Sequence, residues 1–409
     1  MNNDNREARG LTRREFIRTG AAGATGIALS GLGGLTSSAQ EAVGRLPRRR
    51  YGRTGLEISS LVGCAIDWRP DLYPLAVQAG VNYWHKAQYW TAQNMPAALK
   101  CQPREAYYLE VVVDRINGAK AGSIDEEQHN QFVKQCVARS GVGYYDVFKF
   151  HVGYHSVAEA KSNEGLGIVR AFERLKREGL VKHLALSQHH FNEIGGDMAY
   201  DVVGYLINNS PFEAAQFWYT YGDRKEVEDV IALAKKNDFG TIAMKTMGGM
   251  GRSVYDQRFQ AMLAESRFAG SRPGAAVVKW LMSNPNLTAA VIATKSLGQF
   301  QENFGAACQG PLTAGDHEAL GLLAAFNKGQ TCLLCADCVS HCPEHISIAE
   351  ILRYERYALD YHDLSRARSE YKALTKNGSA CIACGDCLPV CKADINIVAK
   401  LKDVHDLLS

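Results

Sequence analysis

Short apolar runs alternate with longer amphipathic segments between residues 50 and 307. Such runs, bounded by turn residues, are typical of buried parallel strands, whereas segments such as 167–178 and 225–236 have helical periodicity. The predicted strands are Leu61–Ile66, Val81–Trp84, Leu109–Val113, Val147–Phe150, Leu184–Leu186, Ala215–Trp218, Thr241–Met244 and Ala289–Ala293. Eight strand–helix units in this span predict an α/β fold, a (β/α)₈ TIM barrel. A doubly wound sheet is the alternative, but no Gly-x-Gly-x-x-Gly follows the first strand.

The C-terminal part is marked by cysteines: the chain has 12, and eight of them fall between Cys332 and Cys391. They form two runs, each with the spacing Cys-x-x-Cys-x-x-Cys-x-x-x-Cys of bacterial ferredoxins. In that pattern three thiolates of a run bind one [4Fe–4S] cluster and the fourth binds the other cluster. We therefore predict two clusters, one on Cys332, Cys335, Cys338 and Cys391 and the other on Cys381, Cys384, Cys387 and Cys342. Pro343 follows the first run, and Lys392 stands in its place after the second, a departure that bears on this crossed assignment.

Zinc and disulfides are the alternatives for these cysteines. A structural zinc site needs only four ligands and rarely takes this triple spacing, and close Cys-x-x-Cys pairs are poor structural disulfides. Between the runs, residues 343–380 carry apolar stripes at helical spacing, from Ile348 to Leu359 and from Leu364 to Leu374. Asn377-Gly378 is expected to end the second helix. The sequence therefore predicts a mainly helical, ferredoxin-like iron–sulfur domain over residues 325–400.

The N-terminus has the parts of an export signal. Arg13-Arg14 precedes Phe16-Ile17, and a weakly apolar Gly/Ala-rich run then ends in Ser37-Ser38-Ala39. This pattern resembles the twin-arginine signal, and we assign it to residues 1–39, with the protein expected in the periplasm or exported. A disordered basic tail is the alternative, but it would not need an apolar run after the arginines. That run is a poor membrane-spanning helix, so no membrane span is expected unless the signal stays uncleaved.

Composition adds little beyond the cysteines. The 409 residues are 46% hydrophobic and 22% charged, which allows one large and one smaller globular domain. The net charge is +3 with acidic and basic residues intermixed, so nothing indicates a nucleic-acid partner. The twin-arginine route carries proteins already folded around cofactors, which fits a protein that holds clusters.

Several segments resemble the aldo-keto reductase family. They are the opening hairpin 51–61, the helix and fifth strand 171–187, and the seventh and eighth strand regions 243–249 and 292–303. The resemblance covers residues 50–307, and with the cysteine runs the chain is similar to predicted oxidoreductases that fuse this barrel to a ferredoxin module. The resemblance implies a site at the C-terminal mouth of the barrel, where an Asp, Tyr, Lys and His transfer hydride between NADPH and a carbonyl.

Three of these four catalytic positions are changed in this chain. Only His151 matches its counterpart, the His of the family. The other positions hold His85 for the Asp, Trp90 for the Tyr, and Val112 or Val113 for the Lys. Because no Lys–Asp pair stands at these positions to acidify a phenol, we do not expect orthodox carbonyl reduction.

More of the positions that contact the nicotinamide cofactor match the family pattern. The resemblance implies cofactor contacts for Ser187, Gln216, Lys295 and Asn303, although Gln188 replaces the usual Asn. Soluble NADPH pools are cytoplasmic, however, so an exported protein needs another electron source. We therefore do not expect NADP(H) to supply the electrons.

Polar residues at the predicted strand ends are the candidates to replace the missing tetrad. The best pair is His85 with His151, joined by Tyr89, which lies one residue from the Tyr position. Converging imidazoles could bind a metal or handle protons. The alternative is a set of hydrogen-bonded residues in a vestigial barrel mouth. Further candidates are Asp67, Lys86, His155, His189, His190 and Lys245.

Three functions follow from these observations. The first is an exported oxidoreductase whose barrel binds a small-molecule substrate or cofactor and exchanges electrons through the clusters with a redox partner protein or electron carrier. The second is a non-catalytic electron-transfer or scaffold subunit. The third is a conventional NADPH-dependent carbonyl reductase.

Overall fold

A computed structural model describes residues 44–409 except 66–67, 114, 117–118, 121–123, 152–153, 155, 163–166, 189–198, 222–224, 248–255 and 267–271. Its centre is a closed barrel of eight parallel strands in the order β10-β11-β12-β3-β4-β5-β8-β9. These strands are β3 (Leu61–Cys64), β4 (Tyr83–His85), β5 (Tyr108–Val113), β8 (Tyr145–Phe150), β9 (Val181–Gln188), β10 (Ala214–Trp218), β11 (Gly240–Met244) and β12 (Ala289–Val291). The predicted (β/α)₈ barrel is confirmed, and each strand overlaps its predicted range. The twin-arginine prediction for residues 1–39 lies outside the described residues.

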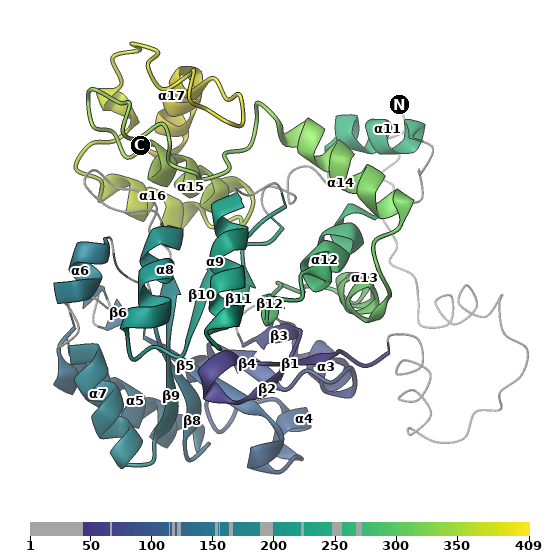
Figure 1. Cartoon of the computed structure of the whole chain (residues 1–409), viewed down its shortest axis with the longest axis vertical. Helices are drawn as coiled ribbons and strands as arrows, with labels where there is room; N and C mark the ends of the chain where they lie inside the picture. Colours follow the sequence, from purple (N-terminus) through teal and green to yellow (C-terminus); the bar gives the residue numbers. More distant parts are fainter. Residues whose placement is uncertain are drawn as a thin grey trace, which may run out of the picture.

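Helices surround the barrel and extend along one side of it (Figure 1). They are α3 (Tyr73–Gln78), α4 (Ala97–Lys100), α5 (Glu126–Ser140), α6 (Val157–Ser162), α7 (Gly167–Arg177), α8 (Ala199–Asn209), α9 (Lys225–Lys236), α11 (Gln257–Glu265), α12 (Pro273–Ser283), α13 (Leu297–Cys308) and α14 (Ala314–Asn327). Short elements complete this part: β1 (Arg48–Arg50), β2 (Glu57–Ser59), β6 (Arg115–Ile116), β7 (Ala119–Lys120), and the 3-10 turns η1 (Gly52–Thr54), η2 (Pro70–Leu72), η3 (Ala87–Tyr89) and η4 (Arg104–Ala106).

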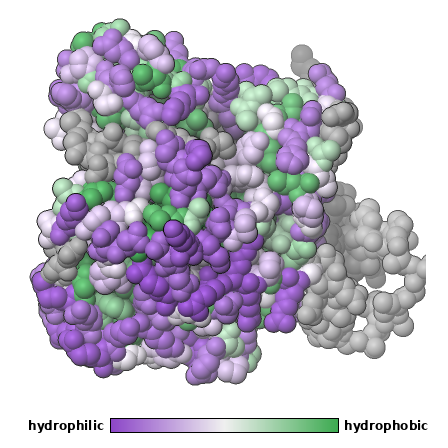
Figure 2. All heavy atoms as spheres, in the orientation of Figure 1, coloured by the Kyte–Doolittle hydropathy of each residue, from purple (hydrophilic) through white to green (hydrophobic). Residues whose placement is uncertain are grey.

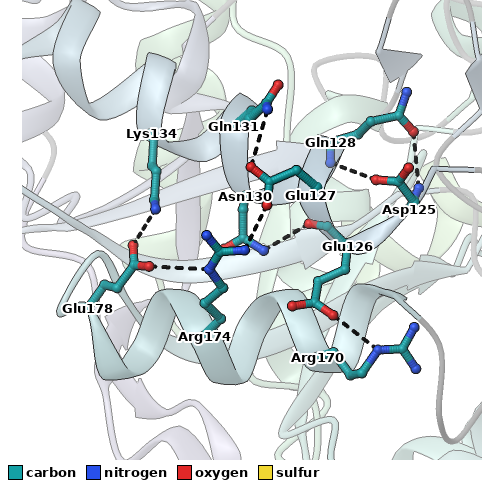
Figure 3. Close-up of polar contacts among 10 residues, drawn as sticks. All are labelled: Asp125, Glu126, Glu127, Gln128, Asn130, Gln131, Lys134, Arg170, Arg174 and Glu178. Atoms are coloured by element: carbon teal, nitrogen blue, oxygen red, sulfur yellow. Dashed lines mark hydrogen bonds and ion pairs between the residues drawn. The ribbon is translucent and has the colours of Figure 1, made fainter.

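The surface of the helices around the barrel is mostly polar on the face seen in Figure 2. In the view of Figure 2, hydrophilic side chains cover most of the barrel surface. Between α5 and α7, Arg174 contacts Glu127 at 2.7 Å and Arg170 contacts Glu126 at 3.1 Å (Figure 3). All four side chains are substantially exposed to solvent, so these ion pairs contribute little to stability.

The interior of the barrel is filled in layers, because every second residue of each strand points inward. The lowest layer is apolar and consists of Val62, Tyr83, Val147, Ala185, Ala214, Ile242 and Ala289, with Tyr51 beneath them. A Cβ on Gly240 would lie 2.5 Å from the ring of Tyr51, so only glycine lets this ring close the bottom of the barrel. The interior side chains one layer higher are polar, and they form the candidate active site.

The C-terminal module is two copies of one unit, 49 residues apart. Cys332 begins the first copy and Cys381 the second (381 − 332 = 49), and each copy leads into a 12-residue helix, α15 (Ile348–Leu359) or α17 (Ile397–Leu408). Left-handed backbone recurs at matching positions of the two loops, at Leu334 and Ala383 and again at His345 and Asp394. Between the copies lie α16 (Leu364–Lys372) and η6 (Gly378–Ala380).

One helix boundary differs from the prediction. The second helix between the two cysteine runs, α16, ends at Lys372, whereas the sequence predicted that Asn377-Gly378 would end it. The Asn377 side chain instead accepts a hydrogen bond from the amide of Ser379 and begins η6. Its short side chain therefore acts as an N-cap rather than as a helix stop. None of the helices in the described ranges combines the length and apolar character needed to cross a bilayer.

The module lies beyond the C-terminal ends of β10 and β11, over the barrel mouth (Figure 1). Trp218, the last residue of β10, belongs to the same hydrophobic core as Leu334, Cys338 and Tyr357 of the module. The mouth of the barrel and the first cysteine loop therefore share one packed interface.

Candidate active site and cluster-binding sites

A buried ion pair lies in the polar interior layer of the barrel. The Nζ of Lys149 on β8 is 2.8 Å from Oε1 of Glu110 on β5, and neither side chain is exposed to solvent. Burial by itself would raise the pKa of Glu110, but Lys149 and His85 outweigh it and hold that pKa at about 2. Glu110 is therefore a carboxylate at neutral pH, compensated within the barrel rather than by water.

His85 completes this network from the end of β4. Its Nδ1 contacts Oε1 of Glu110 and lies 3.1 Å from Nζ of Lys149. Burial and then the charge of Lys149 lower the pKa of His85 to about 4, although Glu110 opposes the shift. The imidazole is therefore neutral at pH 7 and can accept a proton.

Two neutral groups satisfy the remaining polar atoms of the pair. The phenol of Tyr83 donates a hydrogen bond of 2.6 Å to Oε2 of Glu110. On the other side, the Lys149 ammonium donates to the side-chain oxygen of Gln216. The pKa of Tyr83 is raised well above its usual value, first by burial and then by Glu110. Tyr83 is therefore a weaker acid than an ordinary tyrosine, whereas a catalytic tyrosine that donates a proton needs a lowered pKa.

His151 lies beside this network at the end of β8. Its backbone amide donates to the carbonyl of Val113 at 3.0 Å, and its side chain is buried. Burial lowers its pKa well below the usual value, followed by the charges of Lys86, Lys149 and His85. His85 is thus close enough to His151 to affect its pKa, and a joint role of the two histidines stays a prediction.

Tyr89 does not join the two histidines. It ends η3 and its side chain is 50% exposed, while the adjacent Trp90 is buried in an aromatic group with Tyr73 and Trp84. Val112 and Val113 lie in β5, the strand that was predicted for residues 109–113. Of the further candidates, Lys86 and Lys245 follow β4 and β11, whereas Asp67, His155, His189 and His190 lie outside the described residues.

The predicted cofactor residues fall into two places. Ser187 and Gln216 are buried in the barrel, and Gln216 is already bonded to Lys149. Lys295 is exposed just before α13, and Asn303 is buried on that helix. Whether they bind a nicotinamide cofactor stays a prediction.

Sequence reasoning missed Glu110 and Lys149 as members of the site. Glu110 is the one charged residue of the strand Tyr108–Val113, and Lys149 shares the strand Tyr145–Phe150 with a second charged residue, Asp146. A Lys–carboxylate pair is therefore present, although not at the positions that the family resemblance indicated. Because the carboxylate accepts from Tyr83, the pair does not acidify that phenol.

The cysteines form two sets in space, and each set draws on both runs. The inner set is Cys332, Cys335, Cys338 and Cys391. The pKa of the Cys338 thiol is raised first by burial and then by the other three members of this set. Lys392 contacts Asp337 at 3.0 Å, which ties the segment after Cys391 to the first loop. Lys392 thus supports the crossed arrangement, despite the absence of a proline.

Backbone amides also point at the inner sulfurs. The amide of Leu334 donates to Sγ of Cys332 at 3.2 Å, and that of Ile395 donates to Sγ of Cys391 at 3.3 Å. Such N–H···S bonds stabilise thiolates and tune the potential of a cluster.

The outer set is Cys381, Cys384, Cys387 and Cys342. These four residues line one cavity, part of which is open to solvent. Apolar side chains such as Ile346, Val398 and Leu401 line the rest of it. In the described part of the chain, no three His, Cys, Asp or Glu side chains surround a single metal-ion position. A cavity lined by four thiols on apolar walls fits an iron–sulfur cluster in donor type.

Trp218 connects the inner set to the barrel mouth. The guanidinium of Arg356 on α15 lies 4.9 Å from the Trp218 ring, and its Nη1 donates to the carbonyl of Cys332 at 3.4 Å. On the same indole lies Nζ of Lys245, 4.6 Å from the ring centroid. Trp218 thus contacts Lys245 of the barrel mouth on one side, and on the other it contacts Arg356, which bonds to the first cysteine loop.

Comparison with known proteins agrees with both halves of this description. The family model "Aldo/keto reductase family" matches residues 70–323, and the "4Fe-4S dicluster domain" model matches residues 325–392. No curated protein matches the sequence significantly.

Similar solved structures include aldo-keto reductases. A putative aldo-keto reductase from Pseudomonas aeruginosa shares 18% identity with a TM-score of 0.47, over 64% of this chain and 94% of that one. An aldo-keto reductase from Bacillus halodurans, in its apo form, shares 16% identity with a TM-score of 0.49, over 68% of this chain and 96% of that one. The family assignment rests on the family model, which spans more than half of the chain. The protein belongs to the aldo/keto reductase family and is an iron–sulfur oxidoreductase in which that barrel is fused to a 4Fe–4S dicluster domain.

Proposed function

We propose that the protein is an exported oxidoreductase whose barrel mouth exchanges electrons with a redox partner through two [4Fe–4S] clusters. The observation that carries this proposal is the place of Trp218, which packs on the inner cysteine loop while it ends a barrel strand. A bound [4Fe–4S] cluster accepts and releases one electron at a time. The inner set faces the barrel and the outer set includes the exposed Cys384, so the two sets lead from the mouth to the surface.

The residues of the mouth are proposed to handle protons rather than hydride. His85 is neutral at pH 7, and its Nδ1 is held by Glu110, so the opposite ring nitrogen, Nε2, is directed away from the pair. Neutral imidazole accepts a proton from a substrate, and the neighbouring carboxylate stabilises the imidazolium that forms. Lys149 limits that stabilisation, which keeps the proton exchangeable.

NADPH is not proposed as the electron source. The side-chain oxygen of Gln216 accepts from Lys149, and the Tyr83 phenol, which donates to Glu110, has a raised pKa. Both features argue against the hydride-transfer site of an ordinary carbonyl reductase. Export through the proposed Arg13-Arg14 signal supports this, because it would separate the mature protein from the NADPH pool.

The experiment compares two electron donors on the full chain, purified without oxygen. Reduced methyl viologen is expected to produce the EPR signal of reduced [4Fe–4S] clusters within seconds, whereas NADPH leaves the oxidised spectrum unchanged. Reduction by NADPH at a comparable rate would favour the conventional reductase instead.

Export is tested separately. R13K/R14K is expected to hold the full chain in the cytoplasm of a bacterial host, and R48K/R49K serves as the control, because it changes a second arginine pair beyond the signal. Equal export of both variants would remove the twin-arginine assignment and leave the electron-transfer proposal intact.

A further inference from the structure

The two copies of the cysteine unit differ in how far their loops are covered. In the first loop, Val339 is 2% exposed and Leu333 is half-buried. The residues at the same places in the second copy lie 49 positions later (388 − 339 = 49 and 382 − 333 = 49). There Leu388 is 38% exposed and Ile382 is 62% exposed. The second loop therefore presents to solvent the apolar positions that the first loop largely buries.

The barrel accounts for this difference. Trp218 of β10 belongs to the same hydrophobic core as Leu334 and Val339 of the first loop. Arg356 contacts the Trp218 ring and donates to the carbonyl of Cys332. In Figure 1, α17, which follows the second loop, lies on the side of the module away from the barrel. Because the loops are copies of one unit, the exposed side chains of the second loop correspond to the face on which the first loop meets the barrel.

These exposed side chains lie at the outer cysteine set. Ile382 and Cys384 both line the cavity of that set. Cys384 is exposed, whereas Cys335, its counterpart in the first loop, is partly buried. We call Ile382, Cys384 and Leu388 the outer face. Exposed apolar patches mark interaction sites, and a protein docked on this one would lie next to the outer cluster.

The charge of the outer face indicates what kind of protein fits it. In the first loop, Asp337 has Lys392 as its ion-pair partner at 3.0 Å. Its counterpart in the second loop is Asp386, which is exposed and is the one charged residue between Cys381 and Cys391. Across the described ranges, no cation forms an ion pair with Asp386. The four thiolates of the outer set add further negative charge. A cationic partner would therefore complement this face.

We propose that the outer face docks a one-electron carrier protein whose redox centre lies under an apolar contact surface ringed by lysine or arginine. Ile382 and Leu388 pack against the apolar centre of that surface, and Asp386 pairs with a cation of the ring. This inference rests on the proposed function, and it names the class of redox partner.

The step carried out across this interface is an electron transfer alone. One electron leaves the reduced outer cluster and enters the oxidised centre of the carrier, so the cluster is oxidised and the carrier is reduced. No bond is formed or broken, and no proton moves. Such encounters bury little surface, so a small face with one charge is enough for them.

The test uses ferric cytochrome c as the probe, because lysines surround its exposed haem edge. The full, cluster-loaded chain is reduced, freed of reductant and mixed with the probe at low ionic strength, and the haem absorbance gives the second-order rate constant. Acetylated cytochrome c has the same haem and fold without the lysine charges. It should react at least fivefold more slowly than the native carrier.

Variants of the outer face should slow the native carrier. I382Q/L388Q should lower the rate constant fivefold or more, and D386N threefold or more, with the effect of D386N disappearing at high salt. L297Q is the control for the apolar change, because Leu297 is 39% exposed on α13 of the barrel. E105Q is the control for the charge, because Glu105 is exposed on η4, which precedes β5 at the opposite end of the barrel from the module. Both controls should change the rate less than twofold.

Two measurements on the same samples separate docking from other causes. The cluster potentials of the variants should equal those of the wild type, so that a slower rate reports docking rather than driving force. Reduction by methyl viologen needs no docking and should keep its wild-type rate in every variant. A chain whose clusters methyl viologen does not reduce loses the proposed function, whereas normal reduction with no effect of the outer face loses only this inference.

The proposal is overturned if either I382Q/L388Q or D386N reacts within twofold of the wild type, or if acetylated cytochrome c reacts as fast as the native carrier. Should the double variant lose iron, L388Q alone decides. A wild-type dimer that I382Q/L388Q dissociates would assign the face to a second copy of the chain instead. Binding to phosphatidylcholine vesicles that the same variant abolishes would assign it to a membrane.

Discussion

Lys149 and Glu110 face each other across adjacent strands of the barrel, 2.8 Å apart and both out of contact with water. Charges so placed are costly to bury, and their mutual attraction compensates that cost only while both are present. His85, Tyr83 and Gln216 each bond to one of the two. The pair therefore holds the side chains of the polar layer in place, and its two opposite charges compensate each other inside the barrel.

Removing one member of the pair should destabilise the barrel strongly. K149M leaves Glu110 buried without its partner, and the free energy of unfolding should fall by about 3–5 kcal/mol. Urea unfolding followed by tryptophan fluorescence measures it. R69Q is the control, because Arg69 and Asp71 form an exposed pair and the expected change is about 0–1 kcal/mol. A K149M protein within 1 kcal/mol of the wild type would show that the pair is not an energetic unit.

Acid should weaken the fold through His85 before Glu110 responds. The pKa of His85 is about 4 in the folded chain and 6.5 ordinarily, so the unfolded chain binds the proton first and stability falls from pH 6.5 to pH 4. The pKa of Glu110 is about 2 against 4.5 ordinarily, so its contribution is present above pH 4.5 and is lost from there towards pH 2.

H85Q isolates the first of these effects. The wild type should lose about 1–2 kcal/mol between pH 6.5 and pH 5, and H85Q should lose clearly less over the same interval. Urea midpoints at the two pH values measure the difference. H341Q, which changes an exposed histidine, should keep the wild-type slope. Equal slopes in the wild type and H85Q would mean that His85 titrates normally.

Single cysteine changes should report the crossed arrangement. C391A removes a thiolate of the inner set although it lies in the second run, and C342A does the reverse. Each should lower the iron content from about eight to about four per chain, with loss of a different EPR signal. C101A should retain all the iron, because Cys101 is exposed and belongs to neither set. Loss of the same signal from C391A and C387A would contradict the crossed assignment.

Arg356 should set the potential of the inner cluster. It is buried and bonded to the carbonyl of Cys332, so R356Q removes a positive charge close to that set. The inner potential should fall in an EPR-monitored titration, while the outer potential stays unchanged. R368Q, on the exposed face of α16, is the control and should leave both unchanged. If only the potential of the outer cluster shifted, Arg356 would lie nearer to the outer set, and the assignment of the inner and outer sets would be wrong.

The sequence predicted the barrel because parallel strands buried on both faces have a distinctive apolar pattern, and it predicted the cysteine sets because their spacing follows from the shape of a cluster. Glu110 could have been noticed as the one charge in an apolar strand, whereas Lys149 shares its strand with Asp146. Their pairing depends on the barrel interior, where β5 and β8 present inward residues at adjoining levels.

Contacts between the module and the barrel were beyond prediction. The sequence places Trp218 at the end of a strand but does not indicate its partner Arg356, which lies 138 residues away (356 − 218 = 138). Tyr89 was misplaced for a related reason: its spacing from His85 put it near the mouth, but η3 turns its side chain toward solvent. Local pattern fixes neither the direction of a short turn nor the docking of two domains.

The central claim is that two clusters form the electron route of this protein, and one measurement tests it most directly. The full chain, purified without oxygen, is analysed for iron and acid-labile sulfide and is then titrated by EPR. We predict about eight irons and eight sulfides per chain and two one-electron steps, with the signals broadened by magnetic coupling once both clusters are reduced. Zinc in place of iron, or about four irons with a single uncoupled signal, would contradict the claim.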